Sequence, residues 1–235
     1  MFRRRKAPSH VRRRSPADDV PIPGTEQPER AELARPQGPW DIDDVHLGDD
    51  EPADGAELVD LGGLLIRGRP GVEIRLQVDE RTQSVHAVLL VSSDGAVELR
   101  PFAAPRNASV WDDVRREIGA EATRRGGTAT DQQGEFGTEI RLAVPATSTE
   151  GGRQSSGTQV SRVVGVSAPR WLLRGTFMGK PAVEPDPDGA LERAFRDVVV
   201  RRGAGPMAPR SPIPLQLPAG AQHHPPLDES PPSPG

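Results

Sequence analysis

Residues 72–100 read VEIRLQVDERTQSVHAVLLVSSDGAVELR and indicate the fold most clearly. Apolar and polar side chains alternate from Val72 to Val78, which is the pattern of a strand with one buried face. Residues 85–91 are more continuously apolar, and Asp94-Gly95 suits the positive φ angles of a tight hairpin turn before the next alternation at 97–100. We therefore predict three strands here, of which the second and third pair antiparallel.

Outward from this stretch, helical periodicity predicts two principal helices. The first should run from Ser109 to about Arg125, because Trp111, Val114, Ile118 and Ala122 fall on one stripe. The second should begin at Asp186-Pro187 and end with Arg201 and Arg202, just before Gly203.

Four further strands are expected at 128–133, 138–144, 160–167 and 171–178, and residues 146–158, rich in Ser, Thr and Gly, are expected to form a loop. In the strand at 138–144, Ile140, Leu142 and Val144 should face the core, while Glu139 and Arg141 should face outward. This order of elements predicts an α+β fold, a two-layer sandwich of a mainly antiparallel sheet with helices on one face.

Composition predicts that only part of the chain forms this domain. The chain has 235 residues with 26 prolines and 25 glycines, and apolar residues make up 34% of it. We predict a disordered basic arm and linker at 1–39, an acidic segment at 40–56 that docks on the domain, the domain itself at 57–202, and a disordered Pro-rich tail at 203–235. Within that tail, only residues 213–217 are expected to dock.

The sequence also excludes several classes of site. It has no cysteine, which rules out disulfides and thiolate metal sites. No apolar run approaches the roughly 18–20 residues that span a bilayer, so we expect no membrane insertion and a cytoplasmic location. Residues 175–181 resemble a phosphate-binding loop, but one residue is missing between the glycines and Pro181 replaces the magnesium-binding Ser or Thr. We predict no catalytic residue, cofactor or metal site.

Charge is distributed unevenly along the chain. The net charge is −4, yet residues 1–14 contain seven basic side chains and no acidic one. Such an arm could bind a polyanion, including nucleic acid, or contact the acidic stretch 41–60. The candidate polyanion-binding residues are Arg3, Arg4, Arg5, Lys6, Arg12, Arg13 and Arg14.

A second candidate binding site combines Arg170, Trp171 and Arg174 with Trp40. Two guanidinium groups near aromatic rings can hold an anionic group or the carboxylates of a partner. Trp40 precedes the predicted domain, so it is either clamped onto the sheet or exposed as an interaction anchor. A structural role in the core is the alternative for Trp171.

Four short stretches, at 38–41, 60–64, 111–115 and 171–175, together resemble an actinobacterial family of uncharacterised proteins, domain of unknown function 3710. The resemblance covers roughly residues 38–217. It implies no assigned activity, cofactor or catalytic residue.

By elimination, we expect a non-enzymatic module that binds or regulates another protein. Two alternatives stay open: a nucleic-acid-associated protein that uses the basic arm, and an enzyme whose site the sequence does not reveal.

Overall fold

The structure is a computed structural model that describes residues 38–45, 57–79, 81–82, 84–150 and 153–218. All of these belong to one compact unit, Gln37–Gly235. The basic arm and its seven candidate residues lie outside the described residues, as do 46–56 of the acidic segment and the tail from 219. No helix in the described part of the chain is long and apolar enough to span a membrane.

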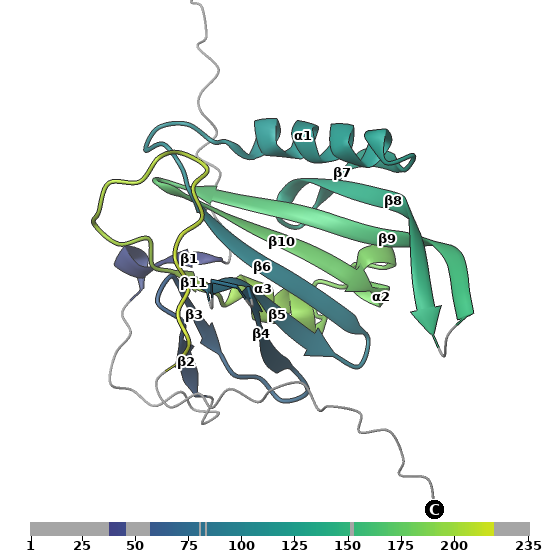
Figure 1. Ribbon diagram of the computed structural model, residues 1–235. Coiled ribbons are helices and arrows are strands. Elements are labelled where there is room, and N and C mark those ends of the chain that lie inside the picture. Colours follow the sequence, from purple (N-terminus) through teal and green to yellow (C-terminus); the bar gives the residue numbers. More distant parts are fainter. Residues whose placement is uncertain (1–37, 46–56, 80, 83, 151–152, 219–235) are drawn as a thin grey trace, which may run out of the picture. The chain divides into compact units, whose positions relative to one another are not determined.

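A seven-stranded antiparallel sheet forms the centre of the fold (Figure 1). Its strand order is β4-β5-β6-β10-β9-β8-β7, and β10 joins the two halves by pairing with both β6 and β9. The strands are β4 (Glu73–Asp79), β5 (Ser84–Ser92), β6 (Gly95–Ala103), β7 (Thr128–Gly134), β8 (Gly137–Glu150), β9 (Arg153–Ala168) and β10 (Trp171–Gly179).

A smaller four-stranded sheet has the order β1-β11-β3-β2, in which β1 runs parallel to β11 and the other neighbours are antiparallel. Its short strands come from both ends of the described chain, so distant segments meet there. They are β1 (Trp40–Asp41), β2 (Leu58–Asp60), β3 (Leu64–Arg67) and β11 (Val199–Val200), with the 3-10 helix η1 (Ile42–Asp44) after β1.

Helix α1 (Trp111–Arg124) packs on one face of the large sheet, over β7, β8 and β9. Trp111 and Ala122 of α1 are buried against Ile140, Val163 and Leu172, and the Trp111 indole donates a hydrogen bond of 2.7 Å to the Thr138 carbonyl. We call this side of the sheet the α1 face.

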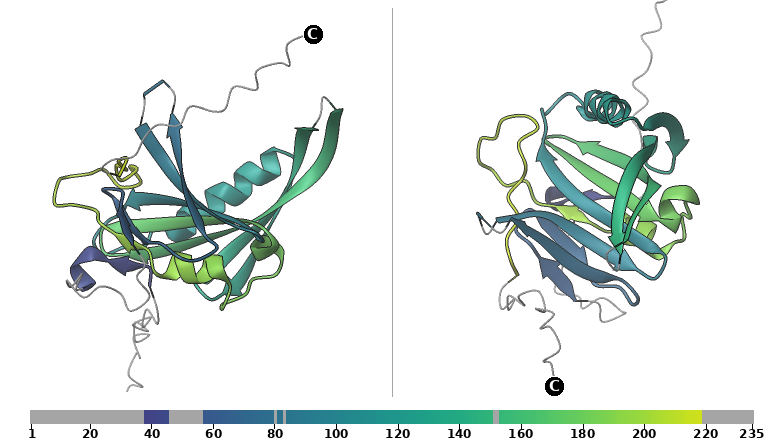
Figure 2. Two further views of the ribbon diagram at one scale, coloured as in Figure 1. Left: turned by 90° about the horizontal axis from the view of Figure 1, so that it is seen from below. Right: turned by 45° about the vertical axis from the view of Figure 1, so that its right-hand side comes forward.

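The opposite face carries α2 (Lys180–Val183), α3 (Ala190–Arg196) and the small sheet. Its core includes the fully buried rings of Trp171, Phe177 and Phe195, and burying each such side chain stabilises the fold by about 1.5–3 kcal/mol. Val163 belongs to the α1 core and Val164 to this one, because successive strand residues point to opposite faces. Figure 2 shows α1 on the far side of the sheet from α3. We call this side the α3 face.

Residues 203–218 pack onto the domain rather than leaving it at residue 202. The Ala103 amide donates to the Ser211 carbonyl at 2.8 Å, and the Gln216 amide donates to the Leu61 carbonyl at 2.9 Å. The segment therefore joins β6 to the small sheet. Ile213 and Leu215 are buried in the core, as the apolar run 213–217 suggests, whereas Leu217 is 48% exposed.

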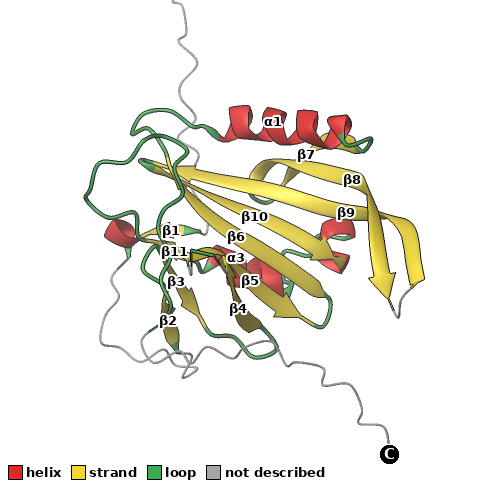
Figure 3. Cartoon of the chain, in the orientation of Figure 1, coloured by secondary structure: helices red, strands yellow, loops and turns green. Residues whose placement is uncertain are grey.

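The expectation of a mainly antiparallel α+β fold is confirmed, and strands far outnumber helices among the described residues (Figure 3). The prediction that helices cover one face is wrong, since α1 and α3 lie on opposite faces. The predicted last helix is too long at both ends. It begins at Ala190 rather than at Asp186-Pro187 and ends at Arg196, and the β-branched run from Val198 leads into β11.

The predicted loop at 146–158 is also wrong, because these residues extend β8 and β9 into a long hairpin. Its pairing continues to Glu150 opposite Arg153, beyond the last pairs that β7 and β10 make with these strands. The hairpin end therefore projects from the sheet as a two-stranded ribbon (Figure 2). Thr and Ser suit a pleated strand as well as a loop, which explains the error.

Candidate functional site

The four residues of the predicted Arg/Trp site do not come together. Trp171 is completely buried on the α3 face, and its indole donates to a carboxylate oxygen of Asp41 at 2.6 Å. Arg174 lies three residues along the same strand and thus points to the α1 face. Arg170 sits in the turn between β9 and β10 with φ 77, and its guanidinium is 3.5 Å from the Ala204 carbonyl.

Trp40 is fixed to the small sheet through its backbone, while its side chain is partly exposed. Its backbone amide donates to the Val198 carbonyl at 2.9 Å, which ties β1 to β11. Its side chain is nevertheless 37% exposed. The next residue, Asp41, accepts the hydrogen bond from Trp171, so the start of the acidic segment is anchored to the core.

Half of the α1 face has no helix packed over it among the described residues. On β6 and β10, side chains that point to the α3 face, such as Val97, Leu99 and Phe177, are completely buried. Apart from Leu172, which packs against α1, those that point to the α1 face are only half-buried. We call this surface the open face; it comprises Leu89 and Val91 of β5, Glu98, Arg100 and Phe102 of β6, and Arg174, Thr176 and Met178 of β10.

Two arginines lie directly opposite each other on the open face. Arg100 of β6 and Arg174 of β10 are cross-strand partners, and like charges in this position repel. Arg100 holds Glu98 through Nε at 2.8 Å and Nη2 at 3.2 Å, whereas the Arg174 Nη2 is 3.8 Å from the same carboxylate. Burial, reinforced by the charge of Arg100, lowers the pKa of Arg174. The single carboxylate of Glu98 therefore pairs with two guanidinium groups.

A groove of about 440 Å³ runs beside Arg174, between α1 and the sheet. We call it the α1 groove. Val114 and Ile118 of α1, Leu142 and Val144 of β8, and Arg174 of β10 line it. Its polar rim is formed by Glu117, Glu121, Arg124 and Arg125 of α1 and its C-cap.

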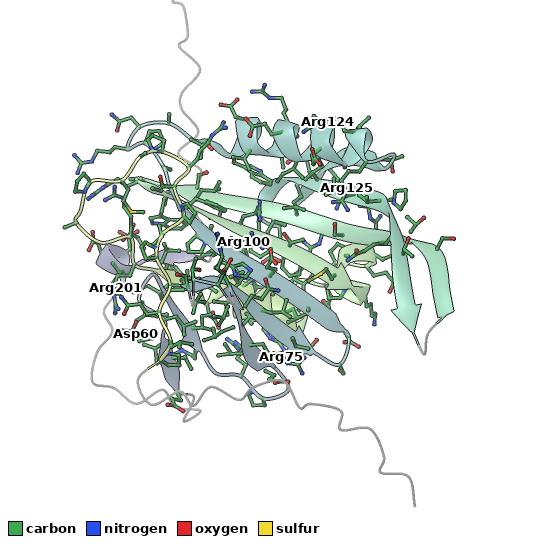
Figure 4. The ribbon with its side chains drawn as sticks, in the orientation of Figure 1. Asp60, Arg75, Arg100, Arg124, Arg125 and Arg201 are labelled. Atoms are coloured by element: carbon green, nitrogen blue, oxygen red, sulfur yellow. The ribbon has the colours of Figure 1, made fainter. Side chains whose placement is uncertain are left out.

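The acidic residues of this rim already have partners. Glu121 pairs with Arg124, and Glu117 accepts from Arg210 at 2.7 Å. Arg125 forms no ion pair with any residue that the structure describes. Figure 4 shows Arg124 and Arg125 at the end of α1 and Arg100 on β6. The open face and the α1 groove together thus carry uncompensated positive charge beside apolar side chains.

A buried ion cluster lies on the α3 face, where Arg162 of β9 meets Glu139 of β8 and Glu192 of α3. Each of the three residues is at most 2% exposed. The Arg162 Nη1 is 3.2 Å from both Glu139 oxygens, its Nη2 donates to Glu192 at 2.7 Å, and its Nε donates to the Pro181 carbonyl at 2.9 Å. The guanidinium also lies 4.1 Å from the centre of the Phe177 ring. Arg162 therefore links two strands to the segment that carries α2 and α3.

The prediction that Glu139 and Arg141 face outward is therefore wrong. Glu139 is buried and paired with Arg162, and Arg141 donates to the Ala182 carbonyl at 3.1 Å. One signal for this cluster was present in the sequence, since the charged Arg162 directly precedes the apolar residues Val163 and Val164, but its partners lie 23 and 30 residues away. Among the described residues, no group of three or more acidic or histidine side chains is arranged to hold a metal ion.

The model of one protein family, described as "Protein of unknown function (DUF3710)", matches residues 38–224. No curated protein matches the chain. The matched range contains every residue of the open face, the α1 groove and the buried ion cluster.

Proposed function

We propose that this chain, which belongs to the DUF3710 family of proteins of unknown function, is a non-enzymatic module that binds another protein through its open face. The observation that carries the proposal is the contrast between the two faces of β5, β6 and β10. One face is sealed by the core, and the other is only half-buried and has no helix packed over it among the described residues, although Arg210 reaches α1 across one end of it.

The residue types of the open face support a protein partner. Aromatic residues, Met and Arg are enriched in protein interfaces, and the open face contains Phe102, Met178, Arg100 and Arg174. In this half of the domain, the small sheet and α3 pack on the α3 face of the large sheet. A partner on the open face would supply the third layer, as α1 does over β7, β8 and β9.

In-cell photo-crosslinking tests the proposal directly, because it captures whichever protein contacts the open face. The photoreactive residue p-benzoylphenylalanine is placed at Thr176 or Val91 on the open face, and at Arg116 on the outer surface of α1 as the control. We expect a discrete covalent adduct with a protein from Thr176 and Val91 but not from Arg116. Adducts from none of the positions, or equally from all three, would contradict the proposal.

A further inference from the structure

We infer that the open face and the α1 groove bind an acidic peptide segment of the partner, in which carboxylates flank apolar side chains. This inference rests on the proposed function and names the chemistry of the partner. It is carried by the unequal pairing of the arginines and by the apolar groove beside them.

The first support is the unused binding capacity of Arg174. Its side chain is 21% exposed, and its contacts are the ion pair of 3.8 Å with Glu98 and the Phe102 ring at 5.4 Å. It donates no hydrogen bond to any residue in the described part of the chain. A good charge-assisted hydrogen bond is about 2.7–2.9 Å long, so a second carboxylate could approach the Arg100 and Arg174 pair and be held more tightly than Glu98 holds Arg174.

The second support is the layout of the α1 groove. Arg174 from β10 and Arg125 from the C-cap of α1 both line it, together with the apolar side chains of Val114, Ile118, Leu142 and Val144. Apolar side chains of a bound segment would fill this space, and acidic side chains on either side would reach the two guanidinium groups. Such a segment would therefore match the α1 groove both in charge and in apolar surface.

The same layout argues against a polyanion as the occupant. Nucleic acid offers closely spaced phosphates, and the rim residues Glu117 and Glu121 would lie near them. Nor would phosphates use the apolar residues of the groove. A peptide with separated carboxylates avoids the rim acids and fills the apolar space.

The experiment is a selection of random peptides displayed on phage against the purified full-length chain. We expect the selected sequences to contain Asp or Glu on both sides of Leu, Ile, Val or Phe. Affinity of the selected peptides is then measured by fluorescence anisotropy. Arg174→Gln and Arg100→Gln should each weaken binding by about tenfold or more, as expected when a charged partner in an interface is neutralised. Replacing the peptide's acids with amides should have the same effect.

Two further variants separate binding from folding. Arg125→Gln changes an exposed side chain on the groove rim and should weaken binding about threefold, as loss of a rim-exposed charge does. Arg116→Gln, on the outer surface of the same helix, should leave affinity unchanged. Selected peptides without acidic residues, no selected peptide, or binding that survives both Arg174→Gln and Arg100→Gln would overturn the inference.

The two proposals fail separately. If Thr176 crosslinks a protein in cells but the arginine variants leave that adduct intact, the partner's acidic character is refuted and the protein-binding function stands. If acidic peptides bind the purified chain but no open-face position crosslinks a protein in cells, the function is refuted.

Discussion

Replacing Arg162 with Met should destabilise the protein severely, because it leaves two carboxylates in the core without their partner. Glu139 and Glu192 are at most 2% exposed, and their ion pairs with Arg162 span 3.2 and 2.7 Å. Breaking a buried ion pair by removing one partner costs about 3–5 kcal/mol. A domain of this size is stable by about 5–15 kcal/mol, so the loss is a large part of the total.

Urea denaturation of the purified chain, followed by far-UV circular dichroism, measures this loss. With a slope of about 2 kcal/mol per molar urea, Arg162→Met should lower the midpoint by about 1.5–2.5 M. Arg116→Met is the matched control, since Arg116 is 71% exposed and its ion pair with Asp113 contributes little. A midpoint for Arg162→Met no lower than that of the control would refute the reasoning.

A rescue variant keeps the prediction testable if Arg162→Met does not fold. Adding Glu139→Gln and Glu192→Gln removes both unpaired charges while keeping the shapes of the side chains. Most of the lost stability should return, because a buried ion cluster can be replaced by neutral groups of similar volume at little cost. A triple variant as unstable as Arg162→Met would show that the charges are not the cause.

The remaining predictions address other parts of the fold. Burial raises the pKa of Glu192, so the stability that its protonated form contributes is complete below the ordinary pKa of 4.5 and is lost as the pH rises through the raised pKa. Relative to Glu192→Gln, the wild type should therefore lose stability from acidic toward neutral pH. A stability difference that is constant or grows with pH would exclude this. Gly165→Ala would bring a methyl group to 2.2 Å from the Trp111 ring and should lower the free energy of unfolding by about 1–3 kcal/mol, measured by thermal unfolding. The control Gly205→Ala, whose new methyl group would have no atom within 4 Å, should lower it by less than about 0.5 kcal/mol. Equal losses for the two variants would contradict the packing of α1. Truncation after residue 209 removes buried Ile213 and Leu215 and should cost about 3–6 kcal/mol, while truncation after residue 218 retains them and should leave the unfolding midpoint unchanged.

Local patterns predicted the strands well because each depends on a few neighbouring residues. The alternation at 72–78 became β4, and β5 and β6 form the predicted hairpin, although its turn falls on Ser93-Asp94 rather than on Asp94-Gly95. The stripe from Trp111 to Ala122 became α1. The last helix was predicted too long because Val198 fits a helical stripe, whereas pairing of Val199 and Val200 with β1 and β3 depends on distant segments.

The candidate site was harder to predict, because it depends on which face of the sheet is covered. Trp171 and Arg174 are close in the sequence, but they lie an odd number of residues apart on one strand. Their side chains therefore point to opposite faces of the sheet, which the sequence alone could have shown. The pairing of Arg174 with Arg100 requires the register between β6 and β10, which are about 70 residues apart in the sequence and so carry no local signal. The burial of Glu139 likewise depends on Arg162, a residue of another strand that is distant in the sequence.

The most direct test of the central claim is the yield of the in-cell crosslink from Thr176, compared between the otherwise unchanged chain and one that also carries Arg100→Gln and Arg174→Gln. Both arginines lie on the same face as Thr176, and neither belongs to the core. The account predicts a protein adduct whose yield falls by about tenfold or more when the two charges are removed. A chain that forms no adduct from Thr176 would contradict the account.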